Sequence, residues 1–331
     1  MANILWMVSA MIVCFVDAHR ISEQCRVQNG VHVKCECNGE EEFLLPEGYN
    51  YENVTSFELS SCTSANLHFS SLTEAYRIEV IIVRNISRLL SFELFLTSKW
   101  IKRLELSRIH KIPVITHDTF ASIRRIESFK IQDTLIENFE EQFTDIVVAD
   151  FVMRNVTLER LGGVNFSERG TSLRITNTAF RNVTNSLNFA YFDNVEIRDS
   201  GFELRKPSHI QIEGNAIVVV NSVFSNATMN LVAKNGVTIN SSCADGKSSL
   251  RVSSSRIQSH DNKLPTEIVY TRSKGDRASP EYTLSVQNNT VCLAGNCKCP
   301  KSNAQNTCLP STWSFVVYLV LLGFSILWSR N

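Results

Sequence analysis

The chain has 331 residues, and its 33 basic residues (Lys and Arg) are balanced by 33 acidic ones, so the formal net charge is zero. The sequence also lacks any run of five or more basic residues. Both features argue against a nucleic-acid-binding protein, and neither suggests attraction to an anionic membrane surface. The length suits one large domain or an elongated array of repeats.

An apolar run opens the chain at residues 4–16 and is too short to cross a bilayer. Val16 and Ala18 then place small residues at the −3 and −1 positions of a secretory cleavage site. We therefore expect residues 1–18 to be a signal peptide and the mature chain to lie in an oxidising compartment.

The cysteines fall into one group at each end of the chain, and none lies between positions 62 and 243. Of the ten, Cys14 belongs to the signal peptide and Cys308 to a C-terminal tail that we expect to be removed. Two disulfides are expected at each end, with the pairing open, because four cysteines allow three pairings. The two Cys-x-Cys motifs could suggest zinc, but a secreted chain favours disulfides. The eight expected disulfide cysteines are Cys25, Cys35, Cys37, Cys62, Cys243, Cys292, Cys297 and Cys299.

A repeated frame, apolar-x-x-apolar-x-apolar, follows the first cysteine group. Its middle anchors are 22 to 25 residues apart, at positions 57, 81, 104, 129, 151, 173 and 195. A further apolar position recurs after the strands, at Cys62, Ile86, Ile109 and Val156. The next step, to Ile210-x-Ile212, is only 15 residues, and the later candidate strands are less regular, at Val218–Val220, Val237–Ile239 and Leu250–Val252.

Short stretches of alternating apolar residues predict half-buried strands, whose inner faces need neighbours to bury them. Strands that recur at this spacing stack into a parallel sheet with a continuous core. We therefore predict a mostly-β fold, a parallel β-solenoid of about 8–10 rungs with disulfide caps at both ends. An ordinary β-sandwich, with strands every 8–12 residues or so, is the alternative that this spacing disfavours.

The stretch Ile101–Phe120 resembles the leucine-rich repeat, whose frame is L-x-x-L-x-L-x-x-N/C-x-L. The resemblance covers residues 54–200 and implies that Cys35 and Cys37 belong to an N-terminal disulfide cap, with Cys292–Cys299 as its C-terminal counterpart. The chain departs from the frame, because Ile, Val and Phe replace Leu and the consensus Asn is missing. Beyond residue 195 the shorter strands are more similar to a right-handed β-helix, so both solenoid types stay open.

The residue between the last two apolar anchors of the frame should point outward, as should the residue two positions later. The first outward column is then Glu58, Ile82, Glu105, Lys130, Val152, Arg174, Glu196 and Gln211. The second is Ser60, Arg84, Ser107, Gln132, Arg154, Thr176, Arg198 and Glu213.

An outward mixture of apolar residues and arginine, such as Ile82 and Val152 beside Arg84 and Arg154, is favoured at protein interfaces. Glycans on the adjacent asparagines would shield that edge. We therefore expect the usable protein-binding patch to be Lys102, Arg103, Glu105, Arg108 and Lys130.

Eight N-x-[ST] sequons occur, which together with a signal peptide predict a heavily glycosylated surface. They are at Asn53, Asn85, Asn155, Asn165, Asn182, Asn226, Asn240 and Asn288.

Residues 260–282 are polar and contain Pro265, Gly275 and Pro280, which favours a loop or an edge segment. Residues 297–310 are expected to form a stalk. The final apolar run, residues 313–328, is 16 residues long and has only three residues after it, whereas a spanning helix needs about 20 apolar residues and usually basic flanks. Small residues at 302–304, a spacer and this tail match a glycolipid (GPI) attachment signal, with Ser302 as the lipidated residue. A short tail-anchored helix is the alternative.

Catalytic motifs such as G-x-S-x-G, H-E-x-x-H or a phosphate-binding glycine loop are missing from the sequence, so we expect no enzyme and assign no catalytic, cofactor or metal residues. His110 and His117 are interpreted as solvated loop histidines. Some parallel β-helices are enzymes that cleave polysaccharides. A set of acidic residues near Arg198 and Arg205 leaves that alternative open, although we favour the interpretation that they are solvated charges on a strand. The set is Asp193, Glu196, Asp199 and Glu203.

The expected organisation is a signal peptide (1–18), an N-terminal cysteine cap (19–53), a repeat solenoid (54–257), a C-terminal cap and stalk (258–302) and a GPI-attachment propeptide (303–331). The expected function is a GPI-anchored surface glycoprotein that binds an extracellular protein ligand or receptor, in adhesion, co-reception or ligand presentation. The membrane is reached only through the lipid, and neither nucleic acid nor a cofactor is expected. The alternatives are a carbohydrate-active β-helix enzyme and a structural protein of the extracellular matrix.

Overall fold

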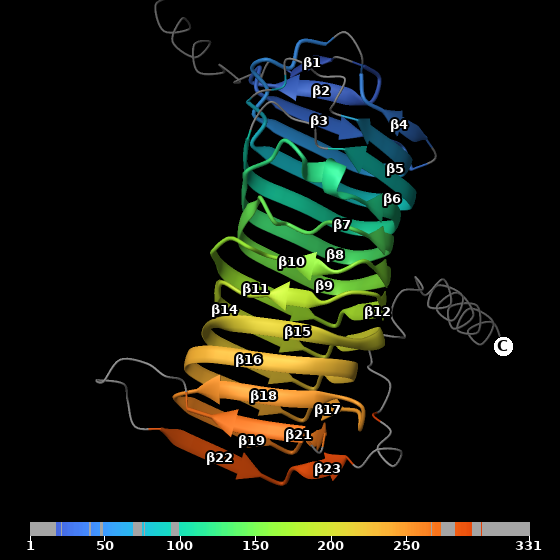
Figure 1. The fold of residues 1–331 in the computed structure, drawn as a ribbon. Helices are drawn as coiled ribbons and strands as arrows, with labels where there is room; N and C mark the ends of the chain where they lie inside the picture. Colours follow the sequence, from blue (N-terminus) through green and yellow to red (C-terminus); the bar gives the residue numbers. More distant parts are fainter. Residues whose placement is uncertain are drawn as a thin grey trace, which may run out of the picture.

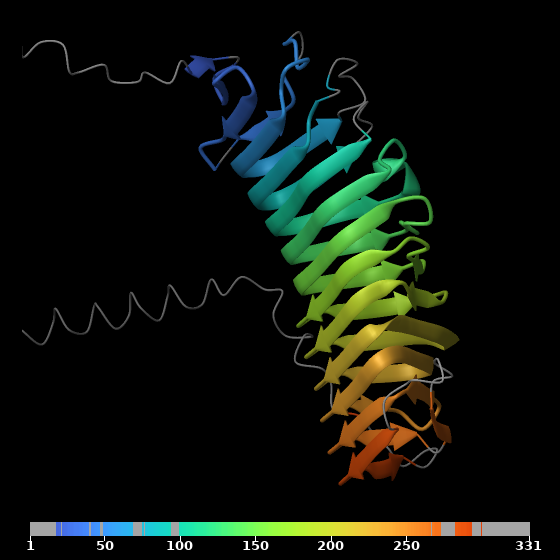
Figure 2. The ribbon, with the colours of Figure 1, turned by 90° about the vertical axis from the view of Figure 1, so that its left-hand side faces the viewer.

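The chain folds into a parallel β-solenoid of about 10 turns, as the spacing of the apolar frame predicts. The computed structural model describes residues 18–20, 22–39, 41–46, 49–68, 75, 77–93, 99–265, 267–272, 282–292 and 299. Figure 1 shows the turns stacked along one axis, from β2 and β3 at one end to β22 and β23 at the other. In the view turned by 90°, the strands of successive turns lie side by side along the whole stack (Figure 2).

Equivalent strands of successive turns pair in parallel and form three stacks, which we call the first, second and third ladders in the order in which the chain meets them. The first ladder begins at β3 (His32–Glu36), which pairs antiparallel with β2 (Cys25–Gln28); β2 in turn pairs antiparallel with β1 (Ala18–Arg20). It continues through β5 (Ser56–His68), β6 (Val80–Glu93), β7 (Trp100–Ile115), β8 (Arg125–Phe139), β9 (Val147–Leu161), β11 (Gly170–Thr176), β14 (Phe192–Arg198), β15 (Gly201–Val220), β16 (Val223–Asn240), β19 (Arg256–His260) and β22 (Thr283–Gln287).

The long strands bend through a corner and also supply the other ladders. The second ladder contains β4 (Glu42–Leu44), the later parts of β5 to β9, β12 (Ala179–Val183), the early parts of β15 and β16, β17 (Cys243–Ala244), β20 (Lys263–Pro265) and β23 (Thr290–Cys292). The third contains β10 (Val164–Asn165), β13 (Leu187–Phe189), the middle of β15 and β16, β18 (Ser249–Ser254) and β21 (Glu267–Thr271). One 3-10 helix, η2 (His117–Phe120), lies among the described residues.

The core is a continuous column of apolar side chains from every turn. Leu104 and Leu106 are fully buried, which confirms the inward register predicted for that strand. Aromatic rings stack from turn to turn: Phe143 lies 5.9 Å from Phe120 and 4.8 Å from Phe166, centroid to centroid. Burial of large side chains at each turn supplies the main stabilisation of such a stack.

From β5 onward, a corner with left-handed backbone follows the first ladder in each turn. The corner residue has a positive φ throughout, at Ser61, Asn85, Arg108, Asp133, Asn155, Asn177, Asp199, Asn221, Ser241, Asp261 and Asn288. Asn and Asp dominate because their short polar side chains tolerate this conformation. The corner turns the chain from the first ladder into the second.

The residue after each corner points inward, and these residues form what we call the corner column. Its first half is mainly apolar, as predicted from Cys62, Ile86, Ile109 and Val156; its second half is polar and buried, with Thr178, Ser200, Ser222, Ser242 and Asn262. Each backbone N–H of this half donates to the side-chain oxygen one turn further on, at 2.8 to 3.3 Å. The column thereby satisfies the buried N–H groups that the corner leaves unpaired.

The predicted register is wrong beyond residue 195. Val195 pairs with Ile217, so the first ladder keeps its spacing, and Ile210 pairs instead with Leu187 in the third ladder. Gln211 and Glu213 therefore leave the outward columns of the first ladder, where Val218 and Val220 take their places. The error arose because all three ladders share the same apolar alternation, so the pattern alone does not say to which ladder a strand belongs.

The segment 260–282, predicted to be a loop or an edge segment, is partly strand. β20 and β21 lie within it and continue the second and third ladders, with Leu264 buried. Residues 273–281 lie outside the described residues.

Candidate functional site

The outer face of the first ladder, from β6 to β11, carries three columns of outward side chains. They are Val80, Arg103, Ser128, Asp150 and Ser172; then Ile82, Glu105, Lys130, Val152 and Arg174; then Arg84, Ser107, Gln132, Arg154 and Thr176. We call these residues the outer face. Five of them are basic and two are acidic, so a chain with no net charge presents a net-positive surface here.

Glu105 is the centre of a charge cluster on the outer face. Arg103 Nη2 donates to Glu105 Oε2 at 2.5 Å, and Arg84 Nη2 donates to the same oxygen at 3.3 Å. Lys130 Nζ lies 3.9 Å from Oε1, and Ser107 Oγ donates to Oε1 at 3.3 Å. The basic side chains therefore converge on one carboxylate.

The environment of Glu105 holds its pKa below the ordinary value. Burial alone would raise the pKa, but the hydrogen bonds from Arg103 and Arg84, together with the charges of Arg84 and Lys130, outweigh it. Glu105 is only 4% exposed, because the long cationic side chains lie over it. The expectation that this residue is solvent-exposed is wrong, although its outward direction is correct.

The other residues of the expected protein-binding patch do not all lie in the charge cluster. Arg103 and Lys130 lie with Glu105 in the cluster. Lys102 lies outside the three outward columns, with its Nζ 2.6 Å from Glu79 Oε2, and Arg108 occupies the corner with a φ of 55°. Ile82, expected to be exposed, is 9% exposed and is therefore part of a covered surface.

Arginines beyond the expected patch extend the outer face toward the C-terminus. Arg154 and Arg174 are both exposed, one and two turns beyond Lys130. Both residues are in the predicted outward columns, but the expected patch left them out, and Arg154 was expected to be shielded by a glycan on Asn155.

All eight sequon asparagines lie in the described part of the chain, and five of them lie at corners. Of the others, Asn53 precedes β5, Asn165 lies on β10 of the third ladder, and Asn240 ends the first-ladder part of β16, beyond the outer face. Asn85, Asn155 and Asn288 occupy the left-handed corner after the first ladder, and Asn182 and Asn226 have positive φ where the chain leaves the second. Asn53, Asn85, Asn182 and Asn288 are exposed, whereas Asn155, Asn165, Asn226 and Asn240 are half-buried. None of the eight falls in the outer face.

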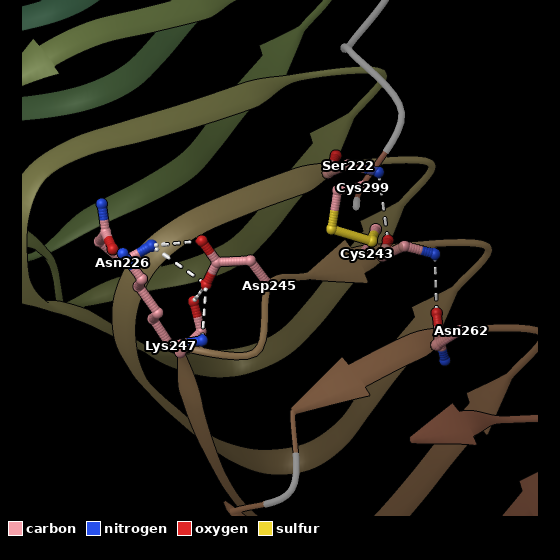
Figure 3. The surroundings of a disulfide bond; sticks show 9 residues. Ser222, Asn226, Cys243, Asp245, Lys247, Asn262 and Cys299 are labelled. Carbon is pink, nitrogen blue, oxygen red and sulfur yellow. Dashed lines mark hydrogen bonds between the residues drawn. A yellow bond between two sulfur atoms is a disulfide. The ribbon is translucent and has the colours of Figure 1, made fainter. Parts of the chain in front are cut away.

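The disulfides close each end of the stack separately. Cys25 pairs with Cys35 and Cys37 with Cys62, which confirms a closed N-terminal set. Cys243 on β17 pairs with Cys299, and Figure 3 shows this bridge with Ser222 and Asn262 of the corner column on either side. Cys292 is also disulfide-bonded, and Cys297 lies outside the described residues.

The acidic set proposed for a polysaccharide-cleaving centre is dispersed. Asp193 contacts Arg169 and Asn215, Glu196 pairs with Arg198 and Asp199 accepts a hydrogen bond from Asn221. Glu203 lies on the second ladder. The structure therefore does not bring these carboxylates together around one point.

A buried carboxylate beside one of the two expected loop histidines escaped the sequence reasoning. Glu141 is fully buried, accepts a hydrogen bond from the Phe143 backbone at 2.6 Å, and lies 3.6 Å from His117 Nδ1. Burial raises the pKa of Glu141, against the opposing backbone hydrogen bond and the histidine. This pair joins η2 to the next turn of the core, while the His117 side chain remains 57% exposed.

Within the described ranges, His, Cys, Asp and Glu side chains form no group of three or more suited to a metal ion. The same part of the chain contains no helix long and apolar enough to cross a membrane. Ser302 and the C-terminal tail lie outside the described residues, so lipidation at Ser302 remains a prediction.

The chain matches no protein-family model, no curated protein and no solved structure.

Proposed function

We propose that the protein is a GPI-anchored, N-glycosylated surface protein that binds an extracellular protein partner through the outer face of the first ladder. The observation that carries the proposal is the net-positive, sequon-free character of that face. Five of the eight sequons lie at corners, where glycans would cover the edges of the solenoid and leave this face accessible.

The flat, parallel first ladder suits a protein partner. A solenoid presents an extended surface built from one strand of every turn, and proteins of this architecture bind partners on such surfaces. Exposed arginines such as Arg154 and Arg174 offer planar, multidentate donors to carboxylates of a partner. We therefore expect an acidic surface on the partner.

The disulfides support an extracellular location, because such bonds persist in oxidising compartments. A lipid anchor at Ser302 would leave the protein with no cytoplasmic part, so signalling would depend on its partner. A phosphatidylinositol-specific phospholipase should release the protein from intact cells; retention with an intact C-terminal epitope would indicate a membrane-spanning tail instead.

The binding test uses the soluble ectodomain, residues 19–302, screened against a panel of cell-surface proteins. For a partner found in this way, the double variant Arg154→Glu/Arg174→Glu should weaken binding at least tenfold, and binding of the unaltered ectodomain should weaken as salt rises. Arg251→Glu, which reverses an exposed charge on the third ladder, is the matched control. Equal binding by the two variants would place the contact elsewhere.

A further inference from the structure

A cleft of about 480 Å³ lies at the corner where the third ladder leads into the first, remote from the charge cluster of Glu105. It is open to solvent and spans four successive turns. Its polar lining residues are Arg169, Tyr191, Asp193, Glu213, Asn215 and Lys234. The volume falls within the range of small-ligand sites, roughly 300–1,000 Å³.

Tyr191 gives the cleft an exposed aromatic wall. It belongs to the two-residue corner between β13 and β14, where its backbone has a φ of 72° and its carbonyl accepts a hydrogen bond from Gly170 N at 3.0 Å. Bulky residues rarely adopt this conformation, which Asn or Gly would tolerate better. The ring is nevertheless 52% exposed and fills no part of the core. An aromatic residue kept in a strained position without a packing role points to a function for the ring.

Four of the polar groups beside Tyr191 take part in side-chain hydrogen bonds. Asp193 Oδ1 accepts hydrogen bonds from Arg169 Nη2 at 2.7 Å and from Asn215 Nδ2 at 3.0 Å. Glu213 accepts one from Gln211 at 2.5 Å. Hydrogen-bonded side chains of this kind are already oriented before a ligand arrives.

The charges of the cleft cancel. Two cations, Arg169 and Lys234, face two anions, Asp193 and Glu213, so the site has no preference for a charged ligand. It presents donors and acceptors in close alternation, and a hydroxyl group is the ligand group that uses both, because it donates one hydrogen bond and accepts two.

The floor of the cleft is backbone. A Cβ at position 214 would lie 2.4 Å from the carbonyl oxygen of Phe192, so Gly214 cannot be replaced without displacement of the neighbouring turn.

From this geometry we infer that the cleft binds a neutral oligosaccharide, with one sugar ring against Tyr191 and its hydroxyls paired to the flanking carboxylates, amide and cations. This site is separate from the outer face, so the result of its test does not bear on the protein partner proposed above.

The test is a binding assay of the glycosylated ectodomain against neutral tetrasaccharides of glucose, mannose, galactose and N-acetylglucosamine, with a sulfated tetrasaccharide as the charged probe. At least one neutral tetrasaccharide should bind with a dissociation constant of about 1 mM or tighter, and the affinity should not change with salt. Tyr191→Ala should weaken it at least tenfold.

Two variants separate a role of the ring from a general defect. Trp100→Ala removes a comparably exposed aromatic side chain, 47% exposed, on the same corner but several turns away, and should leave binding unchanged. Tyr191→Asn suits the left-handed backbone and should keep or raise the melting temperature while binding is lost. Absence of binding to every neutral tetrasaccharide would overturn the inference, as would full binding by Tyr191→Asn or a salt-dependent preference for the sulfated probe.

Discussion

Replacement of Glu105 by alanine is the sharpest test of the charge cluster on the outer face. The substitution removes the carboxylate on which Arg84, Arg103 and Lys130 converge. Two of these cations donate hydrogen bonds to it, and charged hydrogen bonds contribute about 1.5–3 kcal/mol each. Their sum is an upper bound, because burial of the carboxylate has its own desolvation cost.

The solvent exposure of the three cationic side chains determines how much stability is lost. Their side chains are 30%, 50% and 37% exposed, so after the substitution they regain water rather than remaining as buried unpaired charges. We therefore expect a loss of about 2 kcal/mol, below the ~3–5 kcal/mol of a fully buried broken pair. For the ectodomain, residues 19–302, that corresponds to a fall of about 3–4 °C in melting temperature.

The assay is thermal melting of the secreted ectodomain beside a matched variant, Glu196→Ala. Glu196 stands in the same outward column, but its side chain is 38% exposed, and among the described residues its ion-pair partner is Arg198. Its removal should change stability by no more than about 0.5 kcal/mol. If the two variants had the same melting temperature, Glu105 would be an ordinary surface charge and the cluster would not exist in solution.

The pH dependence gives the same test a second readout. Because the pKa of Glu105 is lowered in the fold, the unfolded chain binds more protons than the folded chain below about pH 4.5, and stability falls as the pH drops through that range. Glu105→Gln should lack this part of the loss. Glu141 has the opposite effect on the pH dependence of stability. Because its pKa is raised in the fold, the folded chain binds more protons, and stability rises as the pH falls toward the pKa of an ordinary carboxyl group.

Three further substitutions test the interior and the cap. Ser222→Ala should cost about 1–3 kcal/mol in urea unfolding, because it leaves the buried N–H of the preceding turn without an acceptor; an unchanged unfolding midpoint would contradict the polar corner column. Cys62→Ser should expose one free thiol to alkylation and cost about 2–5 kcal/mol, and resistance to alkylation would mean that another pairing exists. Leu106→Asp should abolish secretion, because it puts an unpaired carboxylate into a fully buried stack, whereas Val152→Asp on the outer face should be secreted normally.

The stacking of the solenoid could be predicted from the sequence because every turn has to meet the same physical requirement. Each strand must bury its inner side chains against the next turn, so Leu104 and Leu106 could be oriented from spacing alone. The predicted register failed at Ile210, which belongs to the third ladder but shows the same apolar alternation as the first. The corner asparagines and aspartates would have corrected it, because Asp199 and Asn221 continue the spacing that Asn155 and Asn177 establish.

The candidate sites were harder to predict from the sequence, because the direction in which a side chain points does not determine how exposed it is. Glu105 points outward as predicted, yet long neighbouring side chains cover it, and only the relation between three turns shows this. The cleft at Tyr191 had no sequence signal at all, because a bulky residue with positive φ breaks the usual preference for Asn or Gly at such corners.

The proposed binding face can be tested most directly with a glycan placed upon it. Arg174→Asn creates an N-x-T sequon on the outer face, because Thr176 follows two positions later, and Arg251→Asn creates an N-x-S sequon on the third ladder with the same change of residue. Both ectodomains should be secreted and carry one extra glycan. We expect the glycan at position 174 to abolish binding to partner-bearing cells and the glycan at 251 to leave it intact, while the glycan-free Arg174→Gln retains most of the binding. Full binding by the ectodomain glycosylated at 174 would contradict the assignment of the outer face.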